Sequence, residues 1–339
     1  MKKYNFVWID DNAQKVESFR PSMEAGPQGG TASATVEVLR VRKDVIAELE
    51  VHSEKWVKTP PDLIIIDQVF NVPVPLGLRG SSVAHLLRKK VPRTPMVCVT
   101  AKLDRPEMID QDDLIEYIAV FPYTKFETYI EDLYSIARDF PKLRTPGGSI
   151  RKHLIGALKA PRRDRDDLER VLPEEFQDRP HSSTEHRMGR WIYNVLLQRP
   201  GFLYDDLHAA TLLGLTPAGF LKVGDIFEQA RYSGVFNTAS NPRWWVSELQ
   251  RVLFEHLAQD APDTPQLAGR TLAGVTTSDY SKCYVSRVTD PPPEAVVYVD
   301  TTPGAARKVV RREFAATHPT DVGVLPGFET RLVLKKRRR

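Results

Sequence analysis

The sequence predicts an α/β protein that begins with a doubly wound, five-stranded parallel sheet. Within the first 140 residues, short apolar runs alternate with amphipathic stretches, as in a chain of β–α units. The run from Asp62 to Asp67 is continuously apolar between its two acids, which is typical of a parallel strand buried on both faces. The whole chain has 339 residues, so further domains are expected after this sheet.

Each element of the sheet region follows from a local pattern. Asn12 is a good helix cap, which favours a helix start beside it, and the Gly/Pro-rich stretch 26–30 predicts a loop. The predicted strands are residues 4–9, 35–41, 62–67, 95–100 and 119–123. The predicted helices are residues 12–24, 44–52, 81–90, 112–117 and 126–140.

A change of composition after this region predicts a mainly helical domain and a small α+β region. Proline, glycine and charged residues dominate the next stretch, so we expect a connecting region with one short helix at 150–160. Further helices are expected at 191–198, 205–213, 216–230 and 245–258, and a helix-like segment at 305–316. The expected divisions are a sheet domain at 1–142, a connecting region at 143–186, a helical domain at 187–260 and a C-terminal region at 261–339.

The positive charge of the chain is confined to its C-terminal end. The sequence has 48 basic and 44 acidic residues, but residues 307–339 alone hold 10 basic and 3 acidic ones. Residues 1–150 hold 20 basic and 21 acidic residues. A broad basic face, which is typical of nucleic-acid-binding domains, is therefore not expected.

Composition also predicts a cytoplasmic protein. No apolar run reaches the length of about 18 residues that a membrane-spanning helix needs, so no membrane partner is expected. The N-terminus leads directly into a strand pattern and does not resemble a signal peptide. Cys98 and Cys283 are too few for a disulfide framework, which favours a reducing compartment.

Polar residues follow the predicted strands at their carboxyl ends, where ligands of doubly wound sheets bind. Three of them are carboxylates, which repel one another when they converge and suit Mg²⁺ as a ligand. A lysine and a threonine at the same edge could pair with an anion, so the set suits phosphoryl transfer onto an aspartate. The set consists of Asp10, Asp11, Asp67, Thr100 and Lys125.

In this arrangement the first 140 residues resemble the receiver domain of bacterial two-component response regulators, which has a flavodoxin-like fold. The acidic pair Asp10-Asp11 follows the first strand and Asp67 ends the third, where the family carries its phosphoacceptor. Thr100 and Lys125 match the family's residues after the fourth and fifth strands.

The resemblance implies a metal site and a partner. Mg²⁺ would be bound by Asp11, Asp67 and the backbone carbonyl of Val69, with Asp10 assisting. Asp67 would accept a phosphoryl group from a histidine kinase or a phosphotransfer protein. These roles are those of a signalling phosphoprotein rather than of a classical enzyme.

Four departures indicate a divergent receiver. Phe126 stands where the family has a proline after its lysine, and Pro122 stands where it has an aromatic residue that changes position on signalling. The stretch 68–80 after the phosphoacceptor is longer than usual, and the Gly-rich stretch before the second strand is an insertion.

The sequence allows several interpretations of what the rest of the chain does. Residues 207–213 and 218–230 could be the two helices of a DNA-binding winged helix, with 232–236 and 243–245 as its wing. Residues 187–260 hold 7 basic and 7 acidic residues, a balance that favours a protein-interaction module, with docking or homodimerisation through 187–339. A third reading is a pseudo-receiver adaptor in a multiprotein system. Nucleic acid or an acidic partner could be contacted by the basic residues Arg311, Arg312, Lys335, Lys336 and Arg337.

A separate enzymatic site is not expected. His181 and His186 are five residues apart, which does not match the i, i+4 spacing of a zinc-binding helix. Cys283 and His318 occur in an order that permits a nucleophile pair, but no recognisable signature surrounds the cysteine.

Overall fold

The computed structural model describes most of the chain and divides it into two compact units, described separately below. The described residues are 2–27, 30, 32–42, 45–70, 79–101, 115–145, 147–176, 183–215, 217–257, 265–274, 295–298, 308–311, 315–316 and 333–334. The N-terminal unit comprises Met1–Leu158, Pro173–Val195 and Gly234–Ser240. The C-terminal unit comprises Lys159–Leu172, Leu196–Ser233 and Asn241–Arg339.

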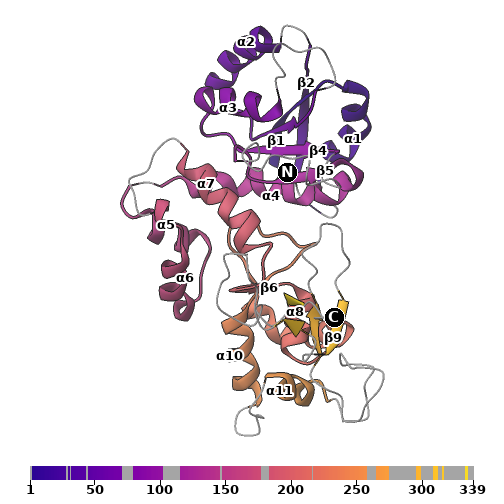
Figure 1. Cartoon of the computed structure of the whole chain (residues 1–339), viewed down its shortest axis with the longest axis vertical. Coiled ribbons are helices and arrows are strands. Elements are labelled where there is room, and N and C mark those ends of the chain that lie inside the picture. The colour runs from indigo at the N-terminus through magenta and orange to yellow at the C-terminus, as the bar shows by residue number, and fades with distance from the viewer. Residues whose placement is uncertain are drawn as a thin grey trace, which may run out of the picture. The chain divides into compact units, whose positions relative to one another are not determined.

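The N-terminal unit contains a five-stranded parallel sheet with the strand order β2-β1-β3-β4-β5 (Figure 1). This is the flavodoxin-like order of doubly wound sheets, in which β2 lies on one side of β1 and the later strands follow on the other side. The predicted fold class is therefore confirmed. The strands are β1 (Lys2–Asp10), β2 (Ala32–Arg40), β3 (Leu63–Asp67), β4 (Met96–Thr100) and β5 (Val120–Pro122).

Helices cover both faces of the sheet because the central strands are apolar on both sides. Val7 and Ile9 of β1 join a core with residues of α2 (Val45–Lys58) and α3 (Gly80–Lys90). The alternate residue Trp8 faces the other way and contacts Phe19 of α1 (Ala13–Ala25). Successive side chains of a strand point to opposite faces, so one apolar run serves two helix layers.

The predicted helix at 126–140 is divided in two. It begins as a 3₁₀ segment, η4 (Tyr123–Tyr129), and continues as α4 (Ile130–Asp139). The backbone of Lys125 is not helical, with φ −132° and ψ 25°, and this residue marks the kink inside η4. The predicted helix at 112–117 lies mostly outside the described residues.

Later parts of the chain return to the N-terminal unit and pack against α4 and the edge of the sheet. α7 (Thr184–Trp191) leads into a π-helical turn, η8 (Ile192–Leu196), where the Tyr193 hydroxyl donates to Asp132 Oδ1 at 2.9 Å. In the segment 234–240, the Phe236 amide donates to Asp139 Oδ2 at 2.8 Å. The N-terminal unit thus extends beyond the residues 1–142 expected for it.

Part of the expected connecting region is helical. It includes α5 (Ile150–Ala157), whose Ser149 cap accepts from the Lys152 amide, and α6 (Arg165–Val171). Short 3₁₀ turns precede and follow α6, namely η6 (Arg162–Asp164) and η7 (Glu174–Phe176), and another, η5 (Phe140–Leu143), follows α4.

The C-terminal unit has its own apolar core, built mainly from helices. The predicted helix at 218–230 is divided near Gly224. In the expected wing, residues 232–236 form no strand, but Arg231 forms an antiparallel bridge with Trp244, and the Tyr232 amide donates to the Arg243 carbonyl at 2.7 Å. Trp244 and Trp245 form β7, which pairs with β6 (Leu203–Tyr204), and both indoles are buried. The helices are α8 (Asp206–Leu212), α9 (Pro217–Val223), the 3₁₀ segment η9 (Gly224–Ala230), α10 (Val246–Leu257) and α11 (Pro265–Leu272).

Short antiparallel strand pairs are described near the C-terminus. The expectation of a helix-like segment at 305–316 is wrong, because the β-branched Val309 and Val310 lie in a strand. The pairs are β8 (Ala295–Tyr298) with β9 (Lys308–Arg311), and β10 (Ala315–Ala316) with β11 (Val333–Leu334). Cys283 and His318 lie outside the described residues. Within the described part of the chain, no helix is both long and apolar enough to cross a membrane.

Candidate metal and phosphoacceptor site

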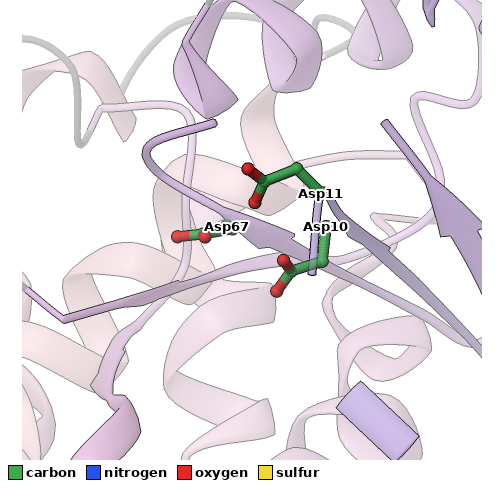
Figure 2. Close-up of side chains that lie close together, drawn as sticks. All are labelled: Asp10, Asp11 and Asp67. Carbon is green, nitrogen blue, oxygen red and sulfur yellow. The ribbon is translucent and has the colours of Figure 1, made fainter. Parts of the chain in front are cut away.

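Three carboxylates converge at the carboxyl edge of the parallel sheet (Figure 2). Asp10 ends β1, Asp11 follows it, and Asp67 ends the neighbouring strand β3. Oxygen atoms of the three side chains all lie within 4.8 Å of one another, and all three residues are buried. The pairing of Ile9 with Ile66 explains this convergence, because it brings the ends of the two strands level.

Asp10 is held by two donors. Its Oδ1 accepts a hydrogen bond from the Asn12 amide at 2.7 Å, and its Oδ2 accepts one from the Tyr123 hydroxyl. Burial, with a smaller contribution from Asp11, raises the pKa of Asp10, although both hydrogen bonds oppose this shift. Burial and the nearby Asp67 and Asp10 charges raise the pKa of Tyr123, so this phenol stays protonated and acts as the donor.

Asp67 is the most strongly perturbed carboxylate of the cluster. Burial, and then the charge of Asp10, raise its pKa to about 7, while the Val69 amide and the charge of Lys15 lower it. The Val69 amide lies 3.4 Å from Asp67 Oδ1. An added cation would therefore favour the ionised form of Asp67, which burial and the charge of Asp10 disfavour.

The start of α3 fixes the backbone beside Asp67. The Gly80 amide donates to the Gln68 carbonyl at 3.1 Å, which joins the start of α3 to the residue that follows β3. A Cβ atom on Gly80 would lie 2.1 Å from the Asp67 carbonyl oxygen, closer than any real contact allows. Glycine at this position therefore lets the helix approach the end of β3.

Thr100 lies at the expected edge, whereas Lys125 does not join the cluster. Thr100 ends β4, is buried, and pairs in register with Pro122. The Lys125 side chain is exposed at the kink inside η4, and no contact between it and the three carboxylates is among those described.

A different lysine, Lys15 of α1, lies at the site. Its charge interacts with Asp67, Asp10 and Asp11, and its Nζ lies 2.9 Å from the centroid of the Tyr123 ring. The sequence analysis missed both Lys15 and Tyr123. The signal for Lys15 was its place in the first turn of the helix that follows the acidic pair.

The donor set suits Mg²⁺, which prefers hard oxygen ligands. Asp10, Asp11 and Asp67 offer carboxylate oxygens, and among the described residues theirs is the one acidic or His/Cys cluster with this geometry. The predicted ligand role of the Val69 carbonyl stays a prediction. Of the basic residues singled out in the sequence, Arg311 lies in β9, while Arg312, Lys335, Lys336 and Arg337 lie outside the described residues.

The strand order and the acidic edge together define a receiver-like α/β domain at the N-terminus. No family model matches the sequence, and no curated protein matches it.

Solved structures with a similar fold are response regulators. One is the receiver (REC) domain of AraT from Geobacillus stearothermophilus, at 14% identity and a TM-score of 0.29, covering 41% of this chain and 95% of that one. Another is the RcsB response regulator of Salmonella typhimurium, at 13% identity and a TM-score of 0.31, covering 56% of this chain and 98% of that one. At such values the fold class depends on the strand order itself rather than on these likenesses.

Proposed function

We propose that the N-terminal unit is a phosphoacceptor domain in which Asp67 takes a phosphoryl group in the presence of Mg²⁺. The observation that carries this proposal is the convergence of Asp10, Asp11 and Asp67 at one edge of a 2-1-3-4-5 sheet. A buried acidic cluster of this kind is costly to hold without a cation. Binding of a functional cation would explain why the three carboxylates lie together at this edge of the sheet.

The chemistry assigned to Asp67 is a simple displacement. A carboxylate oxygen of Asp67 forms a bond to phosphorus, the bond from phosphorus to the donor atom breaks, and the electron pair leaves with the donor. Bound Mg²⁺ would supply positive charge to the phosphoryl oxygens. The Thr100 hydroxyl, at the end of the next strand, would donate a hydrogen bond to the added group.

The partner proposed is a histidine kinase or a phosphotransfer protein, and the output is assigned to contacts of the C-terminal unit or to homodimerisation. The balanced charge of residues 187–260 supports a protein partner over DNA. Residues 218–230 are the helix expected to contact DNA. Lys222 is the one basic residue of this range, and Asp225 and Glu228 follow it. Phosphate neutralisation, which dominates DNA affinity, would find few cations there.

Intact mass spectrometry tests the phosphoryl acceptance. The protein is incubated with Mg²⁺ and acetyl phosphate, beside Asp67→Asn and a matched control, Asp62→Asn. Asp62 stands at the opposite end of the same strand, where its carboxylate accepts from the Asn5 amide at 2.8 Å. We expect one phosphoryl adduct in the wild type and in the control, and none in Asp67→Asn or after chelation. An adduct that persists in Asp67→Asn would refute the assignment.

A further inference from the structure

We propose that Lys15 is the counter-cation of the phosphorylated site, in the place expected for Lys125, and that Tyr123 is the positioning residue that holds it there. This inference rests on the proposed function of Asp67. It concerns residues that the sequence pattern did not single out.

Position is the first support. Asn12 caps α1 through its side chain, which accepts from the Lys15 amide at 3.1 Å, so Lys15 begins the helix directly after the acidic pair. Its side chain is half-buried rather than free in solvent. Lys125, in contrast, has an exposed side chain at a kink of η4.

The Tyr123 ring is the second support. Its face receives the Lys15 ammonium, and its hydroxyl donates to Asp10, so one side chain organises both a cation and an anion of the site. The ring is itself stacked with Trp8 and Phe19, with centroids 6.4 Å apart in each case. A packed aromatic ring holds an ammonium group by cation–π attraction while restricting where it can move.

The charge balance is the third support. Asp67 is the carboxylate that acts most strongly on Lys15, ahead of Asp10 and Asp11. Lys15 repels an incoming Mg²⁺, but it attracts the negative charge that a phosphoryl group adds to Asp67. The same lysine therefore has opposite effects on metal binding and on phosphorylation.

Two measurements on Lys15→Met separate this role from structural damage. Methionine keeps the apolar stem and removes the charge. Relative to wild type, we expect Mg²⁺ to bind roughly fivefold more tightly by calorimetry, because a nearby positive charge is lost. The initial rate of adduct formation with acetyl phosphate should fall at least about tenfold, because a charge that stabilises the transferring group is lost.

Matched variants complete the test. Lys125→Met should change neither quantity, Lys15→Arg should recover most of the rate, and Tyr123→Leu should reproduce the loss of rate, whereas Tyr123→Phe keeps the ring and should lose less. The proposal is overturned if Lys15→Met weakens both Mg²⁺ binding and phosphorylation, or if Lys125→Met alone slows the reaction.

Failure of the proposed function gives a different result. If the wild type forms no adduct, phosphoryl acceptance fails, and the phosphoryl role of Lys15 fails with it. Tighter Mg²⁺ binding by Lys15→Met would then still show that this lysine acts on the metal site, and unchanged binding would remove that role too.

Discussion

The Tyr123 hydroxyl donates a hydrogen bond to the Asp10 carboxylate, joining the turn after β5 to the end of β1. The two residues are 113 positions apart in the chain. The bond crosses the carboxyl edge of the sheet, so it joins the acidic cluster to η4, the segment that follows β5 in the chain. A change at Asp10 therefore acts directly on Tyr123, the first residue of η4.

Removing this hydroxyl should destabilise the N-terminal unit. Tyr123→Phe leaves Asp10 buried with one donor fewer, which costs about 1.5–3 kcal/mol for a hydrogen bond to a charged group. Urea unfolding in the presence of chelator measures the change. Tyr129→Phe, at a half-buried phenol of the same turn, should cost less than 1 kcal/mol, roughly. Equal losses in the two variants would show that the hydrogen bond to Asp10 adds no stability beyond that of an ordinary half-buried phenol.

The contribution of Asp67 to the stability of the metal-free protein should fall as pH rises between about 4 and 7, whereas buried His186 contributes with the opposite sign over much of this range. The pKa of Asp67 is raised from 3.8 to about 7, so in this window the folded state holds a proton that the unfolded state releases. The slope from this group is at most about 1.4 kcal/mol per pH unit. Asp67→Asn should remove this contribution, so the difference between the wild-type and variant profiles should fall as pH rises, and Mg²⁺ should restore stability at the upper end. A wild-type profile that matches Asp67→Asn would contradict the raised pKa.

Gly80→Ala should disturb both folding and the metal site. Its Cβ would meet the Asp67 carbonyl oxygen, so α3 or the end of β3 must shift, at a cost of about 1–3 kcal/mol. Gly156→Ala in α5 is the matched control, because nothing lies within 4 Å of its added Cβ. That variant should be neutral or more stable by up to about 1 kcal/mol. Calorimetry should show weaker Mg²⁺ binding for Gly80→Ala only.

Asp139 should anchor the segment 234–240 on α4. The carboxylate is fully buried, accepts from the Phe236 amide, and pairs with Arg138 and Lys142, each at 2.7 Å. Asp139→Asn removes the charge and should cost about 2–3 kcal/mol. Hydrogen exchange of the amides in 234–240 should also become faster.

The exposed pair of Asp167 and Arg170 provides the control for that prediction. Asp167→Asn should change stability by well under about 1 kcal/mol, since exposed ion pairs contribute little. If Asp139→Asn changed stability as little as Asp167→Asn, the segment 234–240 would be held by packing and not by the Asp139 carboxylate.

His186 should contribute to acid denaturation. Its Nε2 lies 2.9 Å from the Thr94 carbonyl oxygen, and burial lowers its pKa to about 3. The unfolded state binds a proton below about pH 6.5 that the buried imidazole does not bind, so the contribution of His186 to stability is lost as pH falls from 6.5 towards 3. His186→Gln should reduce the steepness of this acid limb in urea titrations at successive pH values. The exposed His85→Gln should leave it unchanged.

Local sequence patterns predicted the sheet and its acidic edge for a clear physical reason. Buried parallel strands must be continuously apolar, so the runs ending at Asp10 and Asp67 could be recognised, and the carboxyl ends of parallel strands meet at one edge. Thr100 was placed correctly by the same argument. The predicted parallel strands by themselves account for the convergence of these residues.

Only the tertiary structure showed that Lys15 lies at the site and what covers α4. The side-chain direction of Lys125 depends on a 3₁₀ turn, and Lys15 reaches the carboxylates because α1 packs beside Tyr123; neither follows from residue spacing. Likewise, Glu131 accepts from the Ser240 amide at 2.9 Å across 109 positions of chain. Such contacts depend on how distant segments pack, and local patterns carry only the periodicity of each element by itself.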